Sequence, residues 1–153
     1  MIDYVSTPSK GIYFTGPDDD YPDKPLQVWT QGQDTNNHNW FPCIDEPRGR
    51  LTSEIVVTVP RGWTAVSNGR LISERSNRSK GTKTFHWLQD REHAVYLITL
   101  VAAEFSRVVL QEAAKNRPLI DFYCQPGREE DGLRAFGNTV SMITLYEDLF
   151  GIP

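Results

Sequence analysis

Alternating apolar and polar residues along most of the chain predict short β-strands. The clearest alternation runs from Leu51 to Val59, where every second side chain faces one side of a sheet and the others face the opposite side. Further β-prone runs, separated by turn residues, occupy Lys10–Thr15, Leu26–Thr30, Trp63–Val66, Arg70–Glu74, Thr82–Gln89, Val95–Ala103, Phe105–Gln111 and Leu119–Cys124. Short strands at this spacing predict a mainly β fold, either an antiparallel β-sandwich or an open sheet.

Two of these runs support more specific predictions. Asn68-Gly69 lies between Trp63–Val66 and Arg70–Glu74, and Asn-Gly is a strong hairpin signal because both residues tolerate positive φ. We therefore expect these two strands to pair with each other. Val95–Ala103 is nearly all apolar, which predicts one strand that is buried on both faces.

The hydrophobic period changes at Pro126-Gly127. From Glu129 onward, apolar residues recur at steps of three and four, the pattern of an amphipathic helix, at Leu133, Phe136, Val140, Ile143, Tyr146 and Phe150. Acidic residues stand at its start, where the helix dipole favours anions, and Gly151 suits its C-cap. A C-terminal α-helix after a β domain predicts the start of a second domain. We expect a partial β domain at 1–125 and the first helix of another, truncated domain at 126–153.

Composition narrows the class of protein. The chain has 153 residues, 39% of them hydrophobic, which is typical of one soluble globular domain. Its formal net charge of −4 argues against nucleic acid or an anionic membrane as a partner, because both require a basic face. No apolar run approaches the ~20 residues of a membrane span, and the N-terminal residues lack the pattern of a signal peptide. These features leave the compartment undecided.

The side chains best suited to binding or catalysis lie in the segment Trp29–Pro47, which reads WTQGQDTNNHNWFPCIDEP. Gln31 and Gln33 stand at the end of an expected strand, and a polar loop follows them. The three histidines of the chain have no metal-ligand spacing, the two cysteines form no C-x-x-C pair, and no G-x-S-x-G elbow occurs. The residues alone therefore predict neither a metal site nor a nucleophile.

Motifs spread over nearly the whole chain resemble those of zinc aminopeptidases of the aminopeptidase N type, a family that includes the leukotriene hydrolase and aminopeptidase B branch. The residues that carry the resemblance are, in chain order, Thr30–Gln33 (TQGQ), Trp40–Pro47 (WFPCIDEP), Val59-Pro60, Val66–Gly69 (VSNG), Tyr96–Phe105 (YLITLVAAEF) and Leu145–Pro153 (LYEDLFGIP).

The resemblance implies a multidomain enzyme that removes N-terminal residues from peptides. Members of this family begin with a saddle-like β domain and continue with a thermolysin-like zinc domain. Its zinc ligands and catalytic glutamate lie in H-E-x-x-H and a downstream Glu, and neither that motif nor the substrate-binding G-x-M-E-N segment occurs here. We therefore expect a fragment that gives structural support and part of the substrate's amino-end pocket. By itself it is expected to hold no zinc and to cleave nothing, the zinc cofactor belonging to the parent enzyme.

The resemblance also assigns two substrate-binding residues. In the family, the last residue of the strand-end motif, usually Glu, contacts the α-ammonium of the substrate; that position is Gln33 here. Gln31 would line the pocket for the first side chain. Period-two spacing predicts that both glutamine side chains lie on one face, and Gly32 between them would allow a ligand to approach the backbone closely. The alternative is that both glutamines only satisfy the loop backbone. Residues Trp40–Pro47 are expected to support the loop, with Asp45 bonding nearby backbone.

Three functions are compatible with these observations. The first is the aminopeptidase, whose partners would be a peptide N-terminus and the downstream catalytic domain. The second is a non-catalytic relative that acts as a protein-interaction scaffold. The third is an independent sandwich that binds sugars or proteins, but it needs an exposed aromatic platform, and all four tryptophans stand in patterns that predict packing. A truncated β domain would also leave open strand edges, so we expect the isolated chain to self-associate.

Overall fold

The computed structural model of the chain describes residues 1–115 and 117–151. It confirms a mainly β fold, because antiparallel strands make up most of its regular structure and α-helix follows them near the C-terminal end. The chain divides into two compact units, Met1–Ala103 and Glu104–Pro153, which we call unit 1 and unit 2.

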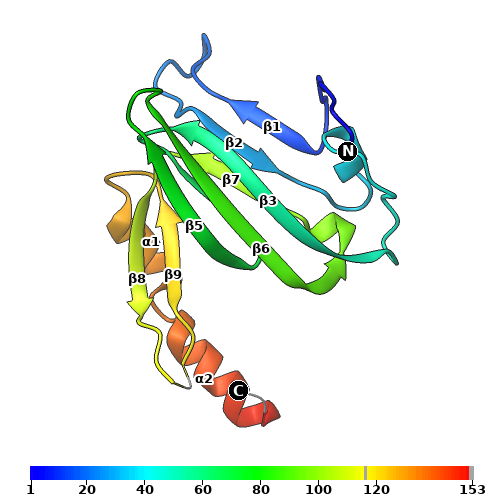
Figure 1. The fold of residues 1–153 in the computed structure, drawn as a ribbon. Helices are drawn as coiled ribbons and strands as arrows, with labels where there is room; N and C mark the ends of the chain where they lie inside the picture. Colours follow the sequence, from blue (N-terminus) through cyan, green and yellow to red (C-terminus); the bar gives the residue numbers. More distant parts are fainter. Residues whose placement is uncertain (116, 152–153) are drawn as a thin grey trace. The chain divides into compact units, whose positions relative to one another are not determined.

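Unit 1 contains two antiparallel sheets (Figure 1). The four-stranded sheet has the order β1-β2-β7-β4, with β1 at Ile12–Thr15, β2 at Gln27–Thr30, β7 at Leu100–Ala103 and β4 at Thr64–Ser67. The three-stranded sheet has the order β3-β6-β5, with β3 at Arg50–Pro60, β6 at Thr82–Ala94 and β5 at Arg70–Asn77. The strand β2 is thus an inner strand, paired on both edges.

The core of unit 1 draws its side chains from both sheets. The buried cluster consists of Val59, Ala65, Phe85, Leu100 and Ala102. Along β3, burial alternates residue by residue, which confirms the alternation predicted for this strand. Because each sheet contributes one apolar face to the same cluster, the two sheets stabilise each other.

The predicted hairpin at Asn68-Gly69 is wrong. The strand before it, β4, pairs with β7, whereas the strand after it, β5, pairs with β6 in the other sheet. Asn68 explains part of this choice, because its side-chain amide donates to Leu97 O at 3.0 Å and its Oδ1 accepts from Thr99 N at 2.7 Å. Gly69 does adopt the positive φ of a tight turn, at 82°, but the turn passes the chain from one sheet to the other.

The single strand predicted for Val95–Ala103 is also wrong. Val95–Leu97 forms a short 3-10 helix, η2, and only Leu100–Ala103 forms the strand β7. Val95 and Ile98 are almost fully buried, as their apolar character requires. Their carbonyl groups, however, accept hydrogen bonds from the side chain of Asn37 and not from a neighbouring strand.

Unit 2 consists of the hairpin of β8 (Ser106–Gln111) and β9 (Ile120–Cys124), followed by the helices α1 (Glu129–Phe136) and α2 (Thr139–Phe150). The expected helical segment is therefore present in two pieces. They are separated by Gly137 and Asn138, two residues of low helix propensity. Gly151 forms the expected C-cap, with φ of 65° and its N–H bonded to Glu147 O at 2.8 Å. The last two residues of the LYEDLFGIP motif lie outside the described residues.

In the described part of the chain, neither α-helix is long and apolar enough to cross a membrane.

Candidate functional site

The predicted site lies in unit 1, immediately after the strand β2. This strand ends at Thr30, and residues 31–33 form the corner that leads into the loop. The hydroxyl of Thr30 accepts a hydrogen bond from Leu100 N at 2.8 Å, and Gln31 N donates to Gly11 O at 2.8 Å. The corner is therefore anchored by hydrogen bonds to β7 on one side and to Gly11, just before β1, on the other.

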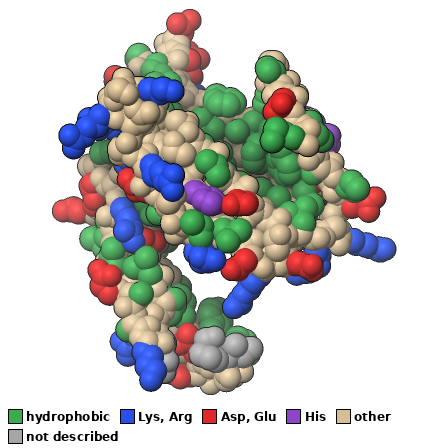
Figure 2. Space-filling view, viewed as in Figure 1, with side chains coloured by type: hydrophobic (Ala, Val, Ile, Leu, Met, Phe, Trp, Pro, Cys, Tyr) green, Lys and Arg blue, Asp and Glu red, His purple; other side chains and the backbone are tan. Residues whose placement is uncertain are grey.

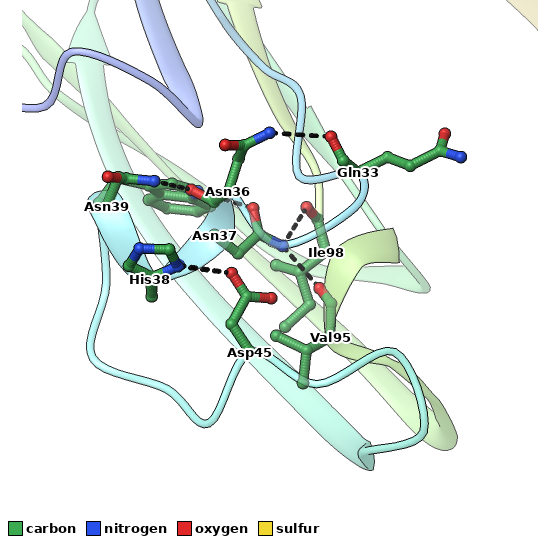
Figure 3. Close-up of polar contacts among 9 residues, drawn as sticks. Gln33, Asn36, Asn37, His38, Asn39, Asp45, Val95 and Ile98 are labelled. Carbon is green, nitrogen blue, oxygen red and sulfur yellow. Dashed lines mark hydrogen bonds and ion pairs between the residues drawn. The ribbon is translucent and has the colours of Figure 1, made fainter.

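The side chains of Gln31 and Gln33 are exposed to solvent. Figure 3 shows the side chain of Gln33 extending away from the loop. Among the described residues, neither side-chain amide has a hydrogen-bond partner, so the alternative that they satisfy the loop backbone is wrong. Because β2 ends before them, strand periodicity does not place both on one face, and their role in binding a substrate stays a prediction.

Asn37 is the buried polar residue beneath this corner. It begins the 3-10 helix η1 (Asn37–Asn39) and its side chain is fully buried. The amide nitrogen donates to Val95 O at 2.6 Å and to Ile98 O at 3.3 Å, and Oδ1 accepts from Trp40 Nε1 at 2.9 Å (Figure 3). Every hydrogen-bonding atom of the amide group thus has a partner, as burial requires.

Gly32 does not give a ligand access to the backbone as predicted. The residue is buried, and a Cβ atom at this position would lie 2.6 Å from both polar atoms of the Asn37 side chain and 2.6 Å from Tyr96 O. Contacts this short are not tolerated, so glycine is required here by the protein's own interior.

Asp45 confirms the prediction that it bonds nearby backbone. Its Oδ2 accepts from His38 N at 2.9 Å and contacts His38 Nδ1 at 3.1 Å. The Asp45 side chain is 6% exposed, whereas the His38 ring is 54% exposed. This pair closes the loop between residues 38 and 45. Within the same loop, the rings of Trp40 and Phe41 meet edge to face with centroids 4.6 Å apart.

Cys43 lies in the same loop as a half-buried free thiol. Burial raises its pKa above the ordinary value, and the nearby Asp45 carboxylate raises the pKa further. Because only the thiolate is nucleophilic, alkylation of Cys43 by iodoacetamide should reach its half-maximal rate at a higher pH than that of glutathione. A mass-spectrometric time course over a pH series measures this midpoint. A midpoint at or below that of glutathione would contradict the prediction.

Trp29 departs from the prediction that every tryptophan is packed. It is 38% exposed, and its ring stacks on Tyr13 with centroids 4.4 Å apart. Figure 2 shows hydrophobic side chains at the surface over β1 and β2, the strands that carry the exposed Phe14 and Trp29. The other three tryptophans are partly buried, and Trp87 donates its indole N–H to Ala65 O at 3.0 Å.

Within the described ranges, no three His, Cys, Asp or Glu side chains come together in a way that could hold a metal ion.

Residues 2–97 match the peptidase M1 N-terminal domain. This chain belongs to that peptidase family. The match contains the whole corner, the Asn37 helix and the loop through Asp45, so the site described above is part of an M1 N-terminal domain.

The relatives of this M1 chain are aminopeptidases. It is 26% identical to aminopeptidase M1 of Arabidopsis thaliana over 124 residues, which are 81% of the chain and 14% of the relative. It is 28% identical to the puromycin-sensitive aminopeptidase of Caenorhabditis elegans, over 80% of the chain and 13% of the relative. It is 26% identical to human glutamyl aminopeptidase, over 82% of the chain and 13% of the relative. The M1 chain thus spans about one seventh of the length of these relatives.

The residues that organise the M1 corner could not be identified from the sequence. Asn37 stands in the run TNNHN, which indicates an exposed polar loop, and nothing in that run distinguishes the one buried asparagine. Gly11 lies 20 residues before the corner, yet its carbonyl bonds Gln31 N. The positive φ of Gly11, 84°, has no signal beyond the glycine itself.

Proposed function

We propose that this chain is the part of a zinc aminopeptidase that holds the amino end of the peptide substrate. The observation that carries the proposal is the pair of exposed amides of Gln31 and Gln33 on an anchored corner, which have no hydrogen-bond partner among the described residues. Membership of the M1 family and the aminopeptidase names of its relatives support it. No observation favours a non-catalytic scaffold.

Gln33 can recognise an ammonium group through its side-chain oxygen. That oxygen accepts hydrogen bonds, and a hydrogen bond to a charged group contributes about 1.5–3 kcal/mol. Because Gln carries no charge, the ionic part of the recognition falls to acidic residues elsewhere in the enzyme. Gln31 would contact the first side chain of the peptide, and this chain's share of catalysis is to orient the substrate's amino end.

Zinc in such an enzyme would polarise the scissile carbonyl and activate water. We propose that its ligands come from a separate catalytic domain of the same enzyme, as the family resemblance implies. We propose that residues 126–153 begin that domain. The exposed apolar side chains of α2 support a contact with it, namely Met142, Leu145, Tyr146, Leu149 and Phe150. In the isolated chain, the same side chains would promote self-association.

Replacing Gln33 with alanine tests the proposed function. In the enzyme that contains this chain, Gln33→Ala should lower kcat/KM for an aminoacyl substrate about 10- to 100-fold, the equivalent of one charged hydrogen bond. Initial-rate kinetics over a series of substrate concentrations measure it. Gln125→Ala is the matched control, because Gln125 is also exposed but lies in unit 2. Equal kcat/KM values for wild type and Gln33→Ala would remove the proposed role.

A further inference from the structure

We infer that Asn37, assisted by Asn36, is a positioning residue for substrate binding: it sets the corner from which Gln33 reaches the α-ammonium. The inference rests on the proposed function. Neither asparagine contacts the substrate itself, but both would control the affinity for its amino group through the position of Gln33.

The first support is the contact between Asn37 and Gly32. Both polar atoms of the Asn37 amide lie 2.6 Å from the position that a Cβ atom of residue 32 would occupy. The backbone of the corner therefore rests directly on this amide, with no side chain between them. A displacement of the amide displaces Gly32, and with it the adjacent Gln33.

The second support is the rigidity of Asn37 itself. Its amide bridges Val95 O, at the start of η2, and Ile98 O, just after its end, and also bonds the indole of Trp40 (Figure 3). The side chain is fully buried, so water cannot replace these partners. Breaking them would leave the buried amide of Asn37 unpaired, which costs about 1–3 kcal/mol, although Val95 O would keep the hydrogen bond from Ile98 N at 3.0 Å. Asn37 is therefore held in one place.

The third support is the clamp formed by Asn36. Its backbone N–H donates to Gly32 O at 2.8 Å, and its side chain donates to Gln33 O at 2.9 Å. Two successive carbonyls of the corner are thus bonded to one residue. Asn36 bonds two carbonyls of the corner and Asn37 packs against Gly32, while the side chain of Gln33 stays free of partners among the described residues.

Enzyme variants with a paired set of inhibitors test the inference. The readout is the amine preference, defined as the ratio of inhibition constants for a competitive inhibitor without and with its α-amino group. Asn37→Ala should lower the amine preference about tenfold or more, since small displacements of a binding group have large effects. Asn36→Ala should lower the amine preference as well. Because Asn36→Ala leaves no buried cavity, it still tests the inference if Asn37→Ala fails to fold.

Asn77→Ala is the matched control, because its side chain also bonds nearby backbone, accepting from Lys80 N at 3.1 Å, but lies at the end of β5 in the other sheet of unit 1. It should leave the amine preference unchanged. The decisive arm repeats Asn36→Ala in a Gln33→Ala background, where no further loss is expected if the asparagines act through Gln33. A purely structural role would lower the affinity for both inhibitors equally in either background.

Two results would overturn the inference while Gln33→Ala still lowers the amine preference. One is an unchanged preference in folded Asn37→Ala and in Asn36→Ala. The other is an equal loss with and without Gln33. Failure of the proposed function gives a different pattern, in which Gln33→Ala itself keeps the full amine preference.

Discussion

Replacing Phe85 with alanine is expected to lower the free energy of unfolding of unit 1 by about 3–5 kcal/mol. Phe85 is 2% exposed and lies in the buried cluster with residues of both sheets. Removing its ring takes away buried apolar area and leaves a cavity between the sheets. Since domains are stable by only about 5–15 kcal/mol, this loss would be a large part of the total.

Urea denaturation followed by tryptophan fluorescence measures the loss, because Trp63 and Trp87 pack against the same cluster. Val56→Ala is the control: Val56 is a large apolar residue on the neighbouring strand β3, but it is 64% exposed. Its loss should stay within about 0.5 kcal/mol, as for most surface substitutions. Similar losses for the two variants would show that the core does not lie where the structure places it.

Gly11→Ala should cost about 2–5 kcal/mol, although it adds only a methyl group. A residue with a Cβ atom pays about 1–2 kcal/mol for the positive φ of 84° found here. The new Cβ would also overlap Asn36 O and lie 2.9 Å from the Trp40 ring, and overpacking of this kind costs about 1–3 kcal/mol. Relief of the overlap requires Asn36 to move, so the corner at Gln33 should be disturbed as well.

Gly81→Ala separates these two contributions. Gly81 also has a positive φ, of 64°, but a Cβ atom there would have no neighbour within 4 Å. It should therefore show only the backbone cost of about 1–2 kcal/mol. Chemical denaturation gives both values. A Gly81→Ala variant as unstable as Gly11→Ala would mean that the overlap with Asn36 contributes nothing.

Local pattern was sufficient to predict many strands and the polarity of their faces. On β3, alternation alone predicted which side chains are buried, because one face of that strand packs on the core and the other faces water. The strands β8 and β9 lie close to their predicted limits and pair as neighbours in sequence. In these cases the partner of each strand is close along the chain.

Prediction failed where a distant segment decides the structure. Asn68-Gly69 has the residues of a hairpin turn, but β4 pairs with β7, and β5 pairs with β6 in the other sheet. Val95–Ala103 has the composition of one strand, but Val95–Leu97 forms η2, and the carbonyls of Val95 and Ile98 accept hydrogen bonds from Asn37. Local periodicity contains no information about either partner.

The candidate site shows the same division. Gln31 and Gln33 were identified through a family resemblance carried by short motifs, and the structure adds that their amides have no partner among the described residues. Asn37 could not be identified in this way, since its burial depends on carbonyls that follow it by 58 and 61 residues. The sequence thus indicated the residues proposed to touch the substrate, and only the structure showed what holds them.

Contacts between residues far apart in the sequence affect the order in which the parts of unit 1 fold during synthesis. The strand β2 pairs with β7, which ends at Ala103, and the N–H of Leu100 bonds Thr30 from 70 residues away in the sequence. On the ribosome, Gln33 therefore emerges well before the turn and strand that fix it. Contacts of such high sequence separation slow folding, because a long loop must close before they form. The corner proposed to bind the substrate is thus among the last parts of unit 1 to reach its final geometry, although it is among the first to be made.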